Sequence, residues 1–439
     1  MDLTNVSAKC GAKCRGSSEL AFIMSRGKRL MAMRSMAVCF HSRSQLYSLT
    51  YLDWGDDPFN INEHFGTSDD LKSLAAALHT RNMSLMVDVV INHLTANQTS
   101  NTIDYSLFPA PFNSEAAYHQ PCTIDFANQS SIEDCWLVAN APPVLPDIKS
   151  ENSTVMDAMI KSVVSLVQEY DIDGIRLDTA RHVPKQYLAQ FQDAVGVFVT
   201  GEALNQSSVY ASQYQGPLDS VINYPLWYVL GDTFVGRTTF DYLAAEMASE
   251  QAMFPDANVW TNFLDNHDQQ RFASREGDDV VRDANGVTFL MFNSGIPVVY
   301  YGFEQRFNGS GDPYNREPFW TSGYNTSATL YKYISRLHDI RDLASGLNGK
   351  SSYFSSKTNV LATSPQYMAF ERGPLVIVVA NVGVNGTNQA MVIPKSQFPE
   401  GTVITDLLSS TTLTVGAGGS FNSTAPGGEA RVSSGYVSS

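Results

Sequence analysis

The sequence contains no long run of apolar residues. Near the N-terminus the longest runs are Leu20 to Met24 and Met36 to Phe40, and both are too short for a membrane span or for the apolar core of a signal peptide. Basic residues are also few, with 29 Lys and Arg against 44 Asp and Glu and a net charge of -15. This balance excludes nucleic acid and anionic membranes as expected partners and favours a neutral or cationic ligand.

Cysteine is scarce as well, because the chain has only five Cys residues and none of their spacings is typical of a metal site. Cys122 and Cys135 lie in one loop-like stretch at a separation that suits a disulfide, whereas the other three have no assigned role. Glycosylation sequons are numerous and favour a secreted glycoprotein, although a Ser/Thr-rich chain produces some by chance. They begin at Asn5, Asn82, Asn97, Asn128, Asn152, Asn205, Asn308, Asn325, Asn385 and Asn422.

The chain of 439 residues is long enough for a barrel of about 250 residues with additions. Residues 1–50 form an atypical basic segment with eight Lys/Arg and two acidic residues. Residues 51–347 alternate helical and strand patterns, which predicts an α/β fold, a (β/α)8 barrel. Within them, about 94–147 has no long period and is interpreted as an inserted subdomain. Residues 348–439 contain short strands separated by turn residues and predict an antiparallel β domain.

Individual elements of the barrel are predicted from periodicity and turn signals. The expected helices are 67–82, 155–170, 186–194, 240–251, 279–293 and 330–343. The expected strands are 85–90, 174–177, 197–200, 221–224, 259–264 and 296–301. If 85–90 is the third barrel strand, the segment before Trp54 has to supply the first two.

Polar clusters follow the predicted strands where each strand ends, which is where a parallel barrel displays its catalytic groups. Asp178 ends the fourth strand, Glu202 the fifth and Asp268 the seventh. Neighbouring strands lie about 4.8 Å apart, so two such carboxylates can approach to the roughly 5–5.5 Å of a retaining glycosidase. Arg176 lies two residues before Asp178, on the same face of the strand, where it can keep that carboxylate ionised.

Each of these residues also has a simpler structural interpretation. A single Asp after a strand is more often a helix cap than a nucleophile, and a single His is more often a hydrogen-bonded structural residue. Asp88, in the middle of an apolar strand, is expected to form a buried ion pair. The functional interpretation depends on the joint placement of these residues at the ends of several strands.

Four ordered blocks carry a resemblance to a known family. They are Asp88-Val-Val-Ile-Asn92-His93, Gly174-Ile-Arg176-Leu-Asp178, Gly201-Glu202 and Phe263-Leu-Asp265-Asn266-His267-Asp268. With flanking text such as Gly66-Thr-Ser-Asp-Asp-Leu-Lys and Gly295-Ile-Pro297, the sequence from about Trp54 to about residue 430 resembles glycoside hydrolase family 13. The similarity is to secreted fungal α-amylases of the Taka-amylase type.

The resemblance implies a role for each matching residue. Asp178 corresponds to the nucleophile, Glu202 to the general acid/base and Asp268 to the carboxylate that stabilises the transition state. The remaining substrate-binding positions implied by the resemblance are Arg176, His93, His267, Arg181, Trp54, Asp312 and Arg316. Arg181 replaces the Lys that is usual in the fungal enzymes, which keeps the charge but changes the donor geometry.

The resemblance also implies a structural Ca²⁺ site and a disulfide. The calcium ligands would be Asn92, Asp147 and the backbone carbonyls of Glu133 and His182, an oxygen set that suits this ion. Cys122 and Cys135 match a disulfide of the inserted subdomain. Ser212 and Phe254 stand where the family has a second disulfide.

The N-terminal segment departs from the family pattern, since its first strands are atypical or missing. Asp53 and Tyr51 align with the family's stacking Tyr and its nearby His, so a ring that binds sugar is absent. A misassembled or truncated start, or divergence, would explain this. A barrel without two strands would have open edges, and we then expect poor folding.

The expected activity is endo-acting, retaining hydrolysis of α-1,4-glucosidic bonds in starch and maltooligosaccharides. The alternatives are a 4-α-glucanotransferase, in which a sugar resolves the glycosyl-enzyme, and a non-catalytic α-glucan-binding or cell-wall protein inactivated by its N-terminus. We expect a secreted monomer that uses Ca²⁺ and binds neither nucleic acid nor membranes.

Overall fold

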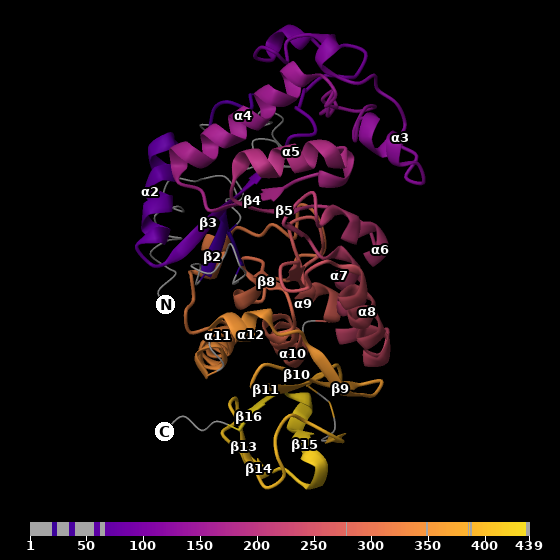
Figure 1. Ribbon diagram of the computed structural model, residues 1–439. Helices are drawn as coiled ribbons and strands as arrows, with labels where there is room; N and C mark the ends of the chain where they lie inside the picture. The colour runs from indigo at the N-terminus through magenta and orange to yellow at the C-terminus, as the bar shows by residue number, and fades with distance from the viewer. Residues whose placement is uncertain are drawn as a thin grey trace. The chain divides into compact units, whose positions relative to one another are not determined.

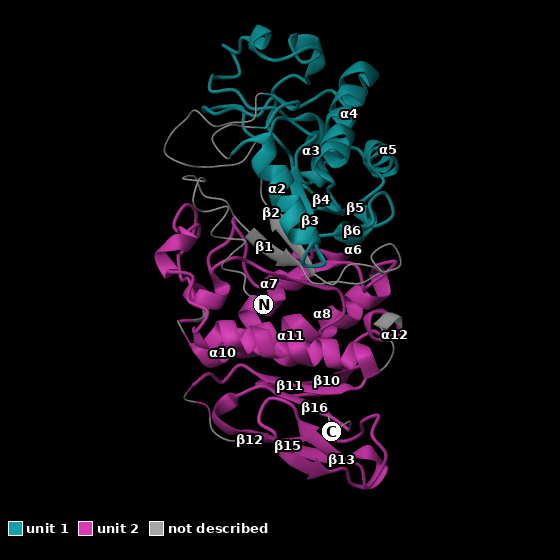
Figure 2. Ribbon diagram, turned by 90° about the vertical axis from the view of Figure 1, so that its left-hand side faces the viewer, with its two compact units in different colours: residues 1–22, 33–205, 209–222 teal, residues 23–32, 206–208, 223–439 magenta. Residues whose placement is uncertain are grey.

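The computed structural model of the protein divides into two compact units, shown in Figure 2 in teal and magenta. Unit 1 comprises residues 1–22, 33–205 and 209–222, and unit 2 comprises residues 23–32, 206–208 and 223–439. The structure describes residues 20–23, 35–39, 57–61, 66–277, 279–347, 350–384, 386 and 389–435. Trp54 and most of the N-terminal segment therefore lie outside the described residues.

Eight strands of the chain belong to one sheet. In unit 1 the neighbouring strands follow in the order β6-β5-β4-β3-β2-β1, and β2 to β6 pair in parallel. The two strands required before Trp54 are thus β1 and β2, and the third strand is the one that the sequence predicted. The bounds are β1 Leu20–Ile23, β2 Ser35–Cys39, β3 Met83–Val89, β4 Gly174–Leu177, β5 Phe198–Gly201 and β6 Ser220–Val221.

The helices of this part of the chain flank the strands, and Figure 1 shows α4 and α5 side by side next to β4 and β5. Between β3 and α4 the chain forms only short elements and isolated β-bridges, which agrees with an insertion after the third strand. The helical bounds are α2 Ser68–His79, η2 Tyr105–Leu107, η3 Glu115–Ala117, α3 Gln129–Asp134, α4 Ser153–Tyr170, η4 Ala180–His182, α5 Lys185–Val195, α6 Ser208–Ala211 and η5 Ser212–Tyr214.

Helix α2 illustrates how the sequence sets a boundary. Thr67 is the N-cap, and its hydroxyl accepts a hydrogen bond from the N–H of Asp70 at 3.2 Å, while Asp70 accepts one from the N–H of Thr67 at 3.0 Å. This capping box satisfies two N–H groups that a helix start otherwise leaves open. Leu71, Leu74 and Leu78 are buried, as their spacing along one face predicted.

One predicted element is wrong in part. The sequence predicted a strand over 221–224, but β6 ends at Val221 and helix α7 begins at Tyr224. The side chain of Asn223 caps α7 by accepting from the N–H of Leu226 at 3.2 Å, and Pro225 occupies the first turn, where its missing N–H costs nothing. These helix-start signals outweigh the apolar run that indicated a strand.

Unit 2 contains the parallel pair β7 and β8 and the antiparallel C-terminal strands. Six of the latter form a sheet in the order β14-β13-β16-β11-β10-β9, and β12 pairs with β15. The strands are β7 Thr261–Phe263, β8 Ile296–Val299, β9 Asn359–Thr363, β10 Tyr367–Arg372, β11 Leu375–Ala380, β12 Gln389–Ile393, β13 Val403–Asp406, β14 Thr412–Thr414, β15 Phe421–Ala425 and β16 Arg431–Ser434.

The helices of unit 2 pack against this C-terminal sheet through one large apolar cluster, which includes Phe289, Leu337, Phe370 and Ile377. Helix α10 contacts β11 directly. The helices are α7 Tyr224–Phe234, α8 Phe240–Met253, α9 Phe272–Glu276, α10 Val280–Phe292, η6 Phe303–Gln305, η7 Phe319–Ser322, α11 Thr329–Leu347, α12 Lys350–Ser355, η8 Ala417–Gly419 and η9 Pro426–Gly428.

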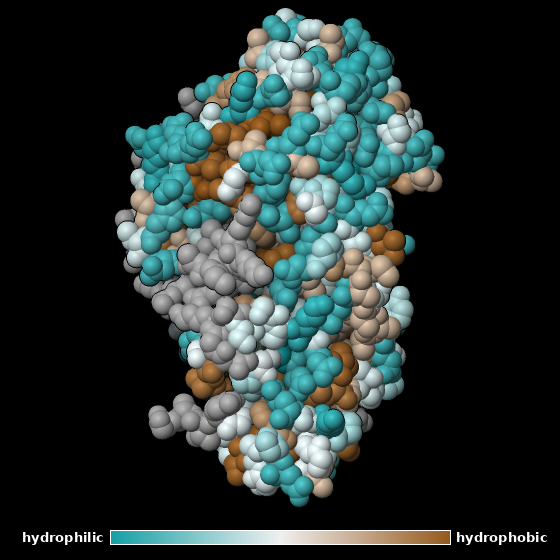
Figure 3. Space-filling model, in the orientation of Figure 1, coloured by the Kyte–Doolittle hydropathy of each residue, from teal (hydrophilic) through white to brown (hydrophobic). Residues whose placement is uncertain are grey.

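The face of the molecule shown in Figure 3 is mostly polar. On the face shown in Figure 3, hydrophilic residues predominate and the apolar residues lie among them in separate areas. In the described part of the chain, every helix falls short of the length and apolar character that crossing a bilayer requires.

Unit 2 also buries a carboxyl group, that of Glu250 in α8. Its side chain is fully buried, Asn223 Nδ2 donates to Oε2 at 3.2 Å, and Oε1 is without a hydrogen-bond partner. Burial raises the pKa of Glu250 well above its ordinary value, although the hydrogen bond from Asn223 opposes this change. The folded protein therefore holds this proton to a higher pH than the unfolded chain does.

We predict that the free energy of unfolding falls less steeply with rising pH in Glu250→Gln than in the wild type. The stability that this group contributes is present below its unfolded pKa and is lost as pH rises through the raised folded pKa. If the folded and unfolded pKa values differ by one, the contribution is about 1.4 kcal/mol. Urea unfolding between pH 5 and 9 should show the variant gaining on the wild type as pH rises. The exposed Glu400→Gln should follow the wild type at every pH, and a parallel course for Glu250→Gln would contradict the prediction.

Candidate active site

The first carboxylate cluster consists of Asp88, Arg176, Asp178 and Glu202, all in unit 1. The parallel register sets Asp88 opposite Arg176 and Arg176 opposite Thr200. Asp178 lies two residues after Arg176, and Glu202 lies two residues after Thr200. Because side chains alternate along a strand, those of Asp178 and Glu202 lie on the same face of the sheet as that of Arg176. The sequence predicted this juxtaposition from strand ends alone.

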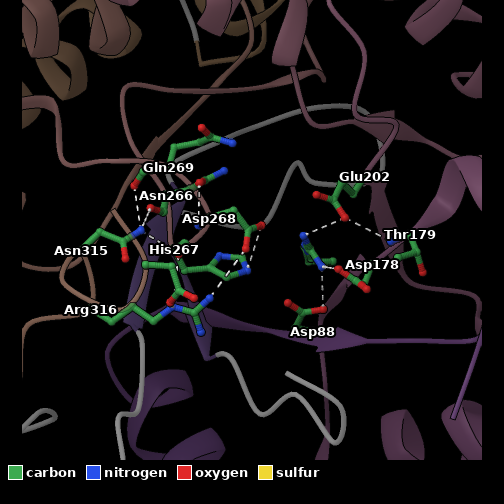
Figure 4. Close-up of polar contacts among 12 residues, drawn as sticks. Asp88, Asp178, Thr179, Glu202, Asn266, His267, Asp268, Gln269, Asn315 and Arg316 are labelled. Atoms are coloured by element: carbon green, nitrogen blue, oxygen red, sulfur yellow. Dashed lines mark hydrogen bonds and ion pairs between the residues drawn. The ribbon is translucent and has the colours of Figure 1, made fainter. Parts of the chain in front are cut away.

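Arg176 is the centre of this cluster, and Figure 4 labels the three carboxylate residues that pair with it, Asp88, Asp178 and Glu202. Its guanidinium forms ion pairs with Asp88 at 3.2 Å, with Glu202 at 3.3 Å and with Asp178. The relative exposures are only 3% for Asp88, 5% for Arg176, 1% for Asp178 and 8% for Glu202. One cation thus holds three carboxyl groups in a region shielded from water, where such charges interact strongly.

The backbone around the cluster is fixed closely. Thr179 has a left-handed conformation, with φ of 50°, and its N–H donates to Glu202 Oε2 at 3.2 Å. A left-handed non-glycine residue costs of order 1–3 kcal/mol, and such residues gather at functional sites. Gly201 precedes Glu202, and a Cβ there would lie 2.4 Å from Leu218 Cδ1. A side chain at the end of β5, directly before Glu202, would therefore require Leu218 to shift.

The second carboxylate cluster consists of His267, Asp268, Asp312 and Arg316, all in unit 2. Arg316 Nε pairs with Asp312 at 3.0 Å, and Arg316 Nη2 lies 3.7 Å from Asp268 Oδ1. His267 Nε2 lies 3.3 Å from Asp268 Oδ2. Asp268 is 32% exposed, so this carboxylate is much more accessible than Asp178.

Asn315 fixes the loop of the second cluster and was not identified from the sequence. Its fully buried side-chain amide donates to the backbone carbonyls of His267 and Gln269, both at 2.8 Å (Figure 4). These bonds span 46 to 48 residues of sequence, so no local pattern could have indicated them. The position of Asn315 directly before Arg316 is the only signal that the sequence offers.

The predicted calcium ligands form two groups in unit 1. Asn92 Nδ2 donates to Asp147 Oδ1 at 2.9 Å, and both side chains are buried. His182 Nδ1 lies 2.9 Å from the carbonyl of Ile132, the residue before Glu133. Burial, with smaller effects from Arg181 and His93, lowers the pKa of His182 to about 4.

Further contacts surround these ligands. His119 Nδ1 lies 2.7 Å from Asp147 Oδ2, and burial raises the pKa of Asp147 to about 7. Among the described residues, no group of three or more His, Cys, Asp or Glu side chains could hold a metal ion. The amide, carboxylate and carbonyl oxygens of the predicted set nonetheless fit the donor preference of Ca²⁺. The predicted disulfide between Cys122 and Cys135 is present.

The remaining predicted residues have separate environments. His93 is buried, and burial lowers its pKa to about 4. Arg181 donates to the carbonyl of Leu204, and its guanidinium lies 5.1 Å from the centre of the Phe126 ring. Trp54 lies outside the described residues.

Paired carboxyl groups at the ends of neighbouring parallel strands are the arrangement expected of a glycoside hydrolase built on a (β/α)8 barrel. Residues 46–370 match the α-amylase catalytic domain, and residues 360–434 match α-amylase domain C. The chain therefore belongs to the α-amylase family, glycoside hydrolase family 13. This confirms the family and the fold that the sequence predicted.

Relatives from fungi support the assignment. Alpha-amylase 1 of Schwanniomyces occidentalis is 36% identical over 385 residues, which cover 86% of this chain and 74% of the relative. The α-amylase of Saccharomycopsis fibuligera is 36% identical over 82% of this chain and 72% of its own length. An α-amylase structure from Malbranchea cinnamomea superposes with a TM-score of 0.86 at 36% identity, covering 90% of this chain and 85% of that one.

We predict that Arg176→Met destabilises the protein by about 3–5 kcal/mol, since it leaves three buried carboxyl groups without their counterion. The free energy of unfolding of Arg176→Lys should lie between those of the wild type and Arg176→Met, because Lys keeps the charge but loses the planar fork of the guanidinium. Urea unfolding followed by circular dichroism measures both variants. Arg237→Met removes an exposed ion pair with Asp232 and should cost less than about 1 kcal/mol. Equal costs for Arg176→Met and Arg237→Met would refute the counterion role.

Proposed function

We propose that the protein is an endo-acting, retaining hydrolase of α-1,4-glucosidic bonds in starch and maltooligosaccharides. The observation that carries this proposal is the convergence of Asp178 and Glu202 on Arg176 at the ends of β4 and β5. A retaining mechanism needs two carboxyl groups close together. The relatives named α-amylase support the choice of substrate.

In the proposed mechanism Asp178 is the nucleophile. Its carboxylate attacks the anomeric carbon while the bond from that carbon to the leaving oxygen breaks, and Glu202 donates its proton to that oxygen. Glu202 then accepts a proton from water, which attacks the glycosyl-enzyme and releases Asp178. Arg176 supports this sequence because its ion pair holds the carboxylate of Asp178 in position. Asp268 would bind sugar hydroxyls and stabilise the oxocarbenium-like transition state.

The other polar residues would bind the sugar chain. His93 and His267 are proposed for the sugar at the cleaved bond, together with Trp54. Asp312 and Arg316 are proposed for a further sugar, which is consistent with their ion pair beside Asp268. Arg181 would contribute on the leaving-group side.

We further propose that Asn92, Asp147 and the carbonyls of Glu133 and His182 hold a structural Ca²⁺. When bound, the ion would supply no reacting group but would cross-link the insertion to the strand ends. The buried Asn92–Asp147 contact and the His182–Ile132 contact already bring these segments together. The sequons with exposed side chains, among them Asn97, Asn308 and Asn422, are consistent with a secreted glycoprotein.

We predict that Asp178→Asn and Glu202→Gln abolish hydrolysis of maltoheptaose. Loss of general acid catalysis alone should reduce kcat by about 10²–10⁴-fold, and loss of the nucleophile should cost at least as much. Unfolding midpoints near that of the wild type would show that the variants are folded. The exposed Asp193→Asn should keep full activity.

Product analysis distinguishes the alternative functions. Newly formed ends in the α configuration, seen by NMR, are expected for a retaining hydrolase. Oligosaccharides longer than the substrate would indicate a glucanotransferase instead. If wild type and Asp178→Asn gave identical traces, the protein would be a non-catalytic glucan-binding protein.

We predict that removal of Ca²⁺ with EGTA lowers the thermal unfolding midpoint and that added Ca²⁺ restores it. A ligand at 100 times its Kd stabilises by about 2.7 kcal/mol. Asp147→Asn should need a higher Ca²⁺ concentration for the same change in midpoint, whereas the exposed Asp157→Asn should respond as the wild type does. A midpoint that EGTA leaves unchanged would remove the calcium proposal without affecting the catalytic one.

A further inference from the structure

Arg341 in α11 is a buried cation that has no counterion among the described residues. Its side chain is 2% exposed, and its Nε and Nη1 atoms are buried without a hydrogen-bond partner. The guanidinium carbon lies 5.3 Å from the centre of the Phe354 ring. An unpaired buried charge is costly, and an arginine does not ordinarily lose its proton.

A second buried guanidinium, that of Arg372 in β10, lies near Arg341. Arg372 is 1% exposed and donates to the backbone carbonyls of Ser356 at 3.2 Å, of Phe354 at 3.3 Å and of Asn293. These three carbonyls compensate its charge. Burial, together with the charge of Arg372, lowers the pKa of Arg341 to about 10.

Tyr353 in α12 completes the group. Its ring lies 5.3 Å from the guanidinium carbon of Arg372, and its hydroxyl is buried without a hydrogen-bond partner. The Tyr353 ring lies 5.1 Å from the Phe354 ring, against which the guanidinium of Arg341 also lies. Helices α11 and α12 contact each other, as Figure 1 also shows. Two open N–H groups and one open hydroxyl are therefore gathered in one place.

Within the described part of the chain, no carboxylate compensates the positive charges of Arg341 and Arg372. None of the described Asp or Glu side chains lies within ion-pair distance of Arg341 or Arg372. Asp342 follows Arg341 in the chain, but its side chain is 74% exposed. The described residues thus bury two positive charges together and supply carbonyl oxygens for only one of them.

We propose that Arg341 and the hydroxyl of Tyr353 bind a small monovalent anion of the chloride class. An anion would accept from the open donors of Arg341 and Tyr353 and reduce the repulsion between the two guanidinium groups. Leu337, Ile340 and Ala344 on the same helix are apolar and buried, and burial of this kind disfavours a phosphate because its greater charge is costlier to remove from water. The ion would join α11 to the segment from α12 to β10, so its role is structural and independent of the proposed hydrolase activity.

The test is the thermal unfolding midpoint of the full chain in sodium chloride, bromide and gluconate at constant ionic strength. We expect a saturable rise of about 2–4 °C with chloride or bromide relative to gluconate. Arg341→Met should lose this dependence and should be at least as stable as the wild type in gluconate, because it removes the uncompensated charge. Tyr353→Phe should weaken the apparent halide affinity about tenfold, the effect of losing one hydrogen bond to an ion.

Arg336→Met is the matched control, because Arg336 is on the same helix but donates to the carbonyl of Leu407. It should keep the full halide dependence. A halide effect that is the same in Arg341→Met and in the wild type, or absent from the wild type, would overturn the proposal. If Arg341→Met did not fold, a crystal soaked in bromide would decide. An anomalous peak beside Arg341 Nη1 would support the site, and no peak there would overturn it.

Discussion

The ion pairs of Arg176 are the constraint on which the candidate active site depends. Three buried carboxyl groups next to one another would repel each other, and removing them from water is costly. The parallel register pairs Arg176 with Asp88 on one neighbouring strand and with Thr200 on the other. The side chain of Arg176 therefore reaches all three carboxyl groups. The ion pairs that compensate the buried carboxyl groups also fix the orientation of the Asp178 and Glu202 side chains. A single residue therefore contributes both to stability and to the geometry that we propose for catalysis.

The loop of Asp268 is organised by a different principle. There the fixed points are backbone carbonyls, which Asn315 and Arg316 engage at His267 and Gln269. Holding the loop by its backbone leaves the carboxylate of Asp268 partly exposed. That suits a group proposed to bind sugar hydroxyls, whereas the nearly complete burial of Asp178 suits a nucleophile held in one position.

The sequence predicted the parts of the molecule that local patterns encode. Strand ends indicated Asp178, Glu202 and Asp268, and the count of strands placed Met83–Val89 third in the sheet. It misjudged 221–224, because a short apolar run does not distinguish a strand from the start of a helix. It did not identify Asn315, Glu250 or Arg341 as special, since each depends on what surrounds it in space. Burial of a polar side chain has no local signature.

The buried arginines differ in the partners that compensate their charges. Arg176 is compensated by carboxylates, Arg372 by three carbonyls, and Arg271 by Glu317 and by the face of Tyr300 at 3.9 Å. Each solution satisfies the rule that a buried charge needs a partner. Among the described residues, Arg341 has no ion pair, and it lies near the ring of Phe354 and a second cation, Arg372. Because the other buried arginines among the described residues also have partners, Arg316 in Asp312 and Arg431 in Asp406, the exception at Arg341 is better explained by a partner from solution than by tolerance of an unpaired charge.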